Sequence, residues 1–108
     1  MCKIFAQQPA ERYAPERRSV RLSGHSTSVC LERFFWEILE EIAARDGVSV
    51  PKFLSILHDE VLEFRGDVTN FASLLRCACL TYVAAKTDGE LPDTISIGGK
   101  RELIGAAA

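Results

Sequence analysis

The sequence lacks the features that mark most membrane, secreted and cofactor-binding proteins. No apolar run approaches the roughly 20 residues that span a bilayer, and the first residues show no apolar stretch or cleavage site of a secretory signal. There is no internal repeat, and no glycine-rich phosphate loop joins a strand to a helix. We therefore expect a single cytoplasmic domain of bacterial type that is not an enzyme, holds no cofactor or metal and does not bind membranes.

The chain has four cysteines, and their positions do not suggest a metal or redox site. The residues are Cys2, Cys30, Cys77 and Cys79, and without a secretion signal we expect thiols rather than disulfides. Cys77 and Cys79, two positions apart on a helix of about 3.6 residues per turn, point about 200° apart. They cannot chelate one ion, so we interpret them as packed thiols.

The chain has two histidines, and neither has the surroundings of a catalytic base. His58 precedes Asp59, but adjacent residues on a helix do not face one another. We interpret this pair as part of a solvated polar face.

The charge is distributed unevenly along the chain. Residues 1–25 carry five basic and two acidic side chains, whereas residues 31–65 carry four basic and eight acidic ones. A basic leading segment fits a protein that touches an anion through its N-terminal part. The alternative is a solvated charged tail, which charge alone favours.

Alternation of apolar and polar residues predicts a strand near the N-terminus. Val20 and Leu22 begin the alternation, and after Gly24 it continues through residues 27–31. This period of two is typical of a strand with one buried face. The preceding residues 1–17 contain Pro9 and Pro15 and no sustained periodicity, so we predict an irregular arm there.

Apolar residues at three- and four-residue steps then predict three helices. Gly47 ends the first, Ser49 caps the second and Thr69 caps the third. We predict a domain over residues 18–86 and a loose tail over residues 87–108. The first helix contains three consecutive aromatic residues, residues 34–36. They cannot all face inward, so one of them is expected to mark an oligomer surface.

A lone strand needs a partner, because both of its edges would leave backbone groups unpaired. Residues 19–22 could fold back on residues 27–31, but only four residues separate the two runs. The other solution, which we favour, is the same strand from a second chain across a two-fold axis. The predicted dimer core is Thr27, Val29, Leu31, Phe35, Trp36 and Leu39.

The order of strand, helix ending at glycine, and serine-capped helix resembles the ribbon-helix-helix superfamily. Leu31 lies sixteen positions before Gly47. This resembles the interval, in the repressors of that superfamily, between the last inward residue of the strand and the glycine between the helices. The sequence RSVRLSGHSTSVCLERFFWEILEEIAARDGVSV (residues 18–50) and the sequence NFASLLRCACLTYV (residues 70–83) resemble a group of short bacterial ribbon-helix-helix domain proteins more closely. The resemblance implies a mostly α fold, with one strand per chain pairing with a second chain, two helices and an added third helix.

The resemblance further implies a homodimeric DNA-binding regulator of transcription whose ribbon enters the major groove of double-stranded DNA. Its base-facing residues would be Ser26, Ser28 and Cys30. Its phosphate clamp would be Ser49, the amide of Val50, and Lys52, at a helix N-terminus. Cys30 is a weak donor and Pro51 has no N–H, and both depart from the pattern.

Further basic residues lie just ahead of the ribbon. We expect Arg18, Arg21 and His25 to add phosphate contacts. For His25, which follows Gly24, a structural role in the turn is an equal alternative. The alternative function is a dimeric protein-interaction module, antitoxin-like or a scaffold, that binds a partner protein through the third helix or the tail.

Overall fold

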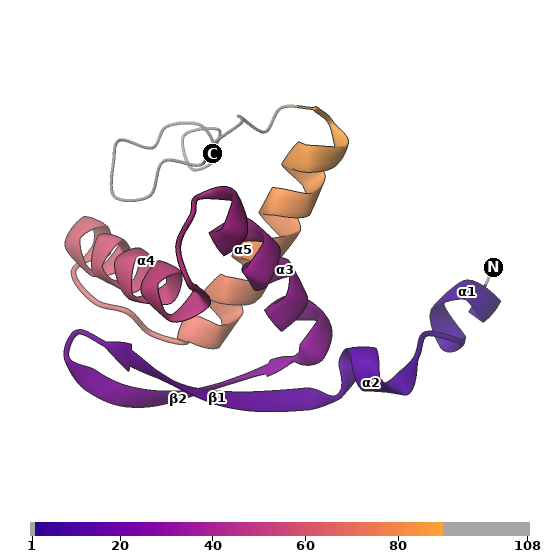
Figure 1. The fold of residues 1–108 in the computed structure, drawn as a ribbon, viewed down its shortest axis with the longest axis horizontal. Helices are drawn as coiled ribbons and strands as arrows, with labels where there is room; N and C mark the ends of the chain where they lie inside the picture. Colours follow the sequence, from indigo (N-terminus) through magenta and orange to yellow (C-terminus); the bar gives the residue numbers. More distant parts are fainter. Residues whose placement is uncertain (1, 90–108) are drawn as a thin grey trace.

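The computed structural model describes residues 2–89, which form one β-hairpin and five helices. The elements in chain order are α1 (Cys2–Ala6), α2 (Ala10–Tyr13), β1 (Pro15–Leu22), β2 (His25–Glu32), α3 (Arg33–Arg45), α4 (Val50–Arg65) and α5 (Phe71–Thr87). Figure 1 shows α3, α4 and α5 together on one side of the hairpin, with α1 beyond one end of the hairpin and on the opposite side of the view from α4. The predicted ribbon-helix-helix order with a third helix is confirmed.

The ribbon contains two strands of one chain, which corrects the expectation of one strand per chain. β1 pairs with β2 in antiparallel register from Pro15 opposite Glu32 to Leu22 opposite His25. The partner that β2 needs is therefore supplied by β1. The alternative in which residues 19–22 fold back is the one that the structure adopts.

The turn is shorter than the sequence suggested because β2 begins at His25. Only Ser23 and Gly24 connect the strands, with φ of 53° and 81°. Two consecutive residues with positive φ are the geometry that matches the twist of a tight hairpin. Gly24 adopts it without strain, because it has no Cβ.

The helix boundaries largely follow the predicted caps. Gly47 adopts a φ of 72° after α3, and the Ser49 hydroxyl accepts a hydrogen bond from the Lys52 amide at the start of α4. The prediction of Thr69 as the third cap is wrong. Asn70, with a φ of 50°, accepts from the Ser73 amide instead, because asparagine tolerates the left-handed region and its side chain reaches the free amides.

The core lies between the inner face of the hairpin and the three long helices. Its buried residues are Val20, Leu22, Val29, Leu31, Trp36, Leu39, Ile42, Ala43, Phe53, Leu54, Leu75, Cys79 and Tyr82. At its centre, the indole N–H of Trp36, a completely buried residue, donates to the Glu16 carbonyl over 2.8 Å. This bond joins α3 to β1 and so helps to hold the helical layer against the ribbon.

The N-terminal arm is more ordered than predicted. The range expected to be irregular holds α1, α2 and the first three residues of β1. α2 contacts α3, and the Arg33 amide donates to the Ala14 carbonyl. The predicted loose tail lies, apart from its first three residues, outside the described residues.

Two ion pairs attach α5 to the rest of the domain. Glu32, at the end of β2, accepts from Arg76 over 2.9 Å. Glu41 of α3 accepts from both the Tyr82 hydroxyl and the Lys86 ammonium. Hydrogen bonds from Arg76 and from Lys86, respectively, lower the pKa of Glu32 and of Glu41 below the usual glutamate value.

Replacing Trp36 with phenylalanine is predicted to destabilise the fold. The change removes the donor to the Glu16 carbonyl and leaves space in the core, so we expect a loss of about 2 kcal/mol in the free energy of unfolding. Urea unfolding followed by circular dichroism measures it. Phe64→Leu, at a highly exposed aromatic residue, is the control and should change stability by less than about 0.5 kcal/mol. Equal effects of the two changes would contradict the anchoring role of Trp36.

The two carboxylates predict an acid-sensitive attachment of α5. Because folding lowers both pKa values, their stabilisation is complete above the unfolded-state pKa and is lost as pH falls through the folded-state values. Glu32→Gln with Glu41→Gln should therefore lower stability at pH 7, by less than about 1 kcal/mol per half-exposed pair. At about pH 3 the variant and the parent should converge. Glu63→Gln, at a carboxylate with no ion pair among the described residues, should show no such convergence. A pH-independent difference would count against the two pairs.

Candidate nucleic-acid interface

The outward face of the hairpin is polar, and its charged side chains between residues 17 and 30 are both arginines. Glu32, opposite Pro15 at the end of the hairpin, has the same parity but is paired with Arg76. The side chains opposite the core are Arg17, Ser19 and Arg21 from β1 and Ser26, Ser28 and Cys30 from β2. The register places Arg17 opposite Cys30, Ser19 opposite Ser28 and Arg21 opposite Ser26. The three base-facing residues predicted from the sequence thus share their face with two arginines of β1.

Arg17 is held over this face by its neighbour. Its guanidinium donates through Nη1 to the Ser28 hydroxyl over 3.1 Å, and the residue is exposed. Arg21 is exposed on the same face. Arg21 lies four positions after Arg17 on β1, so the two arginines are about 13 Å apart, at roughly 3.3 Å per position. The face therefore presents two separated guanidinium groups among small serine side chains.

Arg18 lies on the opposite face from the one expected for a phosphate contact. Its Nε bonds Glu16 over 2.7 Å and its Nη2 bonds Glu40 over 3.2 Å, while the guanidinium carbon lies 4.5 Å from the centre of the Trp36 ring. Partial burial lowers the pKa of Arg18, but the hydrogen bonds to the two glutamates outweigh it and raise the pKa overall. The Arg18 side chain therefore has a structural role.

The alternation of the strand could have identified this difference. Val20 and Leu22 face inward, so every second residue before them, Arg18 and Glu16, faces inward as well. Arg17 shares the parity of Arg21. Arg17 was not predicted because the strand pattern was taken to begin at Ser19 and residues 1–17 were assigned to an irregular arm.

The remaining residues predicted to contact phosphate lie elsewhere. His25 is exposed beside the turn and pairs with Leu22. Ser49, Val50 and Lys52 form the first turn of α4, which Figure 1 shows on the helical side of the hairpin. The Lys52 amide already donates to Ser49. The structure therefore does not bring this helix N-terminus together with Arg17 and Arg21.

The predicted dimer core is largely enclosed within one chain. Val29, Leu31, Trp36 and Leu39 are buried, and Thr27 and Phe35 are half-buried. Their role in a dimer stays a prediction. The burial of four of them does not depend on a second chain.

A serine, a histidine and an aspartate meet at the tip of the hairpin, which sequence reasoning missed. The Ser23 hydroxyl lies 3.4 Å from His58 Nδ1 and donates to Asp59 over 3.3 Å. A catalytic relay instead places histidine between serine and carboxylate. The contact joins the turn to α4, and the ring of His58 packs edge-on against Phe71. We interpret it as structural.

The described residues do not suggest other classes of site. None of their helices combines the length and the apolar character needed to cross a membrane. Within the same residues, no three histidine, cysteine, aspartate or glutamate side chains gather in a way that could hold a metal ion.

Comparison with known proteins agrees with this architecture. The chain is similar to the solved structure of an uncharacterized protein from Bordetella pertussis Tohama I, with a TM-score of 0.83 and 44% sequence identity over 88% of this chain and 78% of that one. No curated protein matches the sequence. Residues 15–83 match the family model described as ribbon-helix-helix domain, from the first residue of β1 into α5. The chain belongs to the ribbon-helix-helix domain family.

Proposed function

We propose that the protein is a homodimeric regulator of transcription that binds double-stranded DNA with the outward face of its hairpin. The observation that carries this proposal is the placement of Arg17 and Arg21 on one exposed face of a two-stranded ribbon. An antiparallel ribbon of this kind fits the major groove, where base edges can be distinguished.

The side chains of this face have the chemistry for reading bases. Arginine binds the O6 and N7 atoms of guanine through two hydrogen bonds, and serine hydroxyls can donate or accept. A separation of about 13 Å between Arg17 and Arg21 corresponds to about four base pairs at roughly 3.4 Å each. Cys30 is too weak a donor to bind a base edge firmly. Arg17, directly opposite Cys30 on the paired strand, supplies the stronger donor.

The acidic part of the chain does not oppose this contact. Glu37, Glu40 and Glu41 belong to α3, on the helical side of the hairpin in Figure 1. Glu40 and Glu41 also form ion pairs with Arg18 and Lys86. These acidic residues of α3 therefore lie behind the proposed interface rather than on it.

Because each chain forms its own hairpin, a homodimer would carry two ribbons rather than one shared ribbon. Dimers with two reading elements bind two half-sites related by the protein's two-fold axis. The proposal therefore favours a palindromic operator with two separated half-sites.

Replacing the outward arginines tests the proposal. Duplexes selected from a random library by the parent protein provide the probe, and fluorescence anisotropy measures affinity. We expect Arg17→Ala and Arg21→Ala each to lower affinity about tenfold or more. Circular dichroism should remain unchanged, because both side chains are exposed.

Arg65→Ala is the matched control. It removes the same charge from an exposed residue at the end of α4, and it should leave affinity within about twofold of the parent. Parental affinity in the Arg17→Ala, Arg21→Ala double variant would overturn the assigned interface. A parent protein that binds no duplex, even at low salt where phosphate contacts are strongest, would overturn DNA binding itself.

A further inference from the structure

We propose that the groove between α3 and α5 binds the N-terminal arm, residues 2–13, of a second copy of this chain. Two copies would exchange their arms reciprocally and so form a closed dimer. This inference rests on the homodimer of the proposed function and assigns the surface that forms it.

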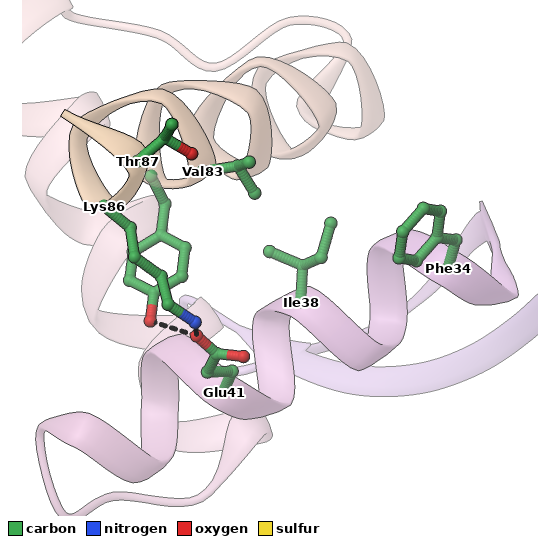
Figure 2. Close-up of a pocket in the computed structure, with 7 residues that line it drawn as sticks. Phe34, Ile38, Glu41, Val83, Lys86 and Thr87 are labelled. Atoms are coloured by element: carbon green, nitrogen blue, oxygen red, sulfur yellow. Dashed lines mark hydrogen bonds and ion pairs between the residues drawn. The ribbon is translucent and has the colours of Figure 1, made fainter.

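The groove is open to solvent, and its lining is mainly apolar. Its lining residues are Phe34, Ile38 and Glu41 of α3 and Tyr82, Val83, Lys86 and Thr87 of α5, around a volume of about 430 Å³. In Figure 2, Ile38 projects from α3 toward Val83, and Phe34 projects from the same side of α3 farther to the right. The hydrogen bonds that join Glu41 to Tyr82 and Lys86 close the polar end of the groove. The remaining surface suits apolar side chains.

Leu80 extends this apolar surface along α5. It lies three residues before Val83 and therefore on the same stripe of the helix, and it is 59% exposed. Phe34 is also substantially exposed. Of the three consecutive aromatic residues, Trp36 is buried and Phe35 is half-buried, so Phe34 is the one that marks an oligomer surface.

The arm carries the complementary feature. α1 has five residues, and Ile4 and Phe5 are 77% and 65% exposed. Isolated helices shorter than about 12 residues are marginal in water, and helices gain their stability from packing an apolar face. An arm that presents two large apolar side chains on so short a helix therefore needs a surface to cover it.

The position of the arm favours a second copy over its own groove. α2 contacts α3, and the Arg12 guanidinium lies 4.5 Å from the centre of the Phe34 ring. The base of the arm is thus fixed at one end of its own groove. From there α1 leads away from α3 and α5, as Figure 1 shows. Because α1 extends away from its own groove, it can reach the groove of a second copy.

Charge at the rim fits the same occupant. Glu37 lies between Phe34 and Glu41 on the helical surface of α3, by its spacing of three and four residues. It is exposed and faces Arg33 over a loose 3.8 Å. Lys3 precedes Ile4 in the arm, so docking of the apolar pair would bring an ammonium group near the Glu37 carboxylate.

Reciprocal exchange gives two identical contacts related by a two-fold axis, which closes the assembly at two copies. The groove is formed by α3 and α5, whereas Arg17 and Arg21 lie on the face of the hairpin that points away from the helices. Exchange of arms therefore leaves Arg17 and Arg21 of both copies exposed.

The molar mass of the full chain in solution, measured by light scattering over a roughly hundredfold range of concentration, tests the inference. We expect the parent to have the mass of two chains. Ile4→Ser with Phe5→Ser removes the apolar pair of the arm, and Val83→Asp places a charge in the groove. Both variants should have the mass of one chain, with the circular dichroism of the parent.

Two controls make the result specific. Phe64→Ser changes a highly exposed apolar residue outside the groove and should remain dimeric. A chain ending at Gly89 should also remain dimeric. A truncated chain that becomes monomeric would assign the dimer contact to residues 90–108 and overturn the inference. Dimers that persist in both the arm and the groove variants would overturn the exchange while leaving the homodimer intact. A monomeric parent would overturn both.

Discussion

The register of β1 against β2 is the constraint on which the other features of this protein depend. Side chains alternate between the two faces of a strand, so a shift of one residue would exchange every inward side chain for an outward one. The observed register buries Val20, Leu22, Val29 and Leu31. It also directs Arg17 and Arg21 outward while turning Arg18 onto Trp36. The same pairing thus determines both the core and the charge of the candidate interface.

The local sequence was sufficient to predict the helices and one face of the ribbon. Gly47 and Ser49 determine boundaries through the backbone geometry and the hydrogen bond that their types favour, and both were identified correctly. Val29 and Leu31 were assigned to the inner face from alternation alone. The hairpin was not the favoured alternative, because the positive φ of Ser23 is unusual for serine and the pair Ser23–Gly24 lay within what looked like a four-residue gap.

The site was harder to predict because it depends on contacts between distant residues. Arg17 and Arg18 are adjacent and chemically identical, and they differ only in the face of β1 that each occupies. That difference becomes visible once Glu16 and Glu40 are seen to bind Arg18. The approach of His58 to Ser23 likewise spans 35 positions, and no local pattern encodes it. Sequence periodicity shows which residues of a strand share a face only where the first and last residues of that strand are known.

The separation of the outward face of the ribbon from the α3–α5 groove has an evolutionary consequence. The outward face of the ribbon and the groove share no residues, and substitutions at separated sites usually have additive effects. Descendants of one ancestral chain could therefore alter the residues that face outward from the ribbon without disturbing the groove, or alter the groove without disturbing the ribbon. The two surfaces are free to diverge at different rates, and the rigid core that separates them is the part that must be retained.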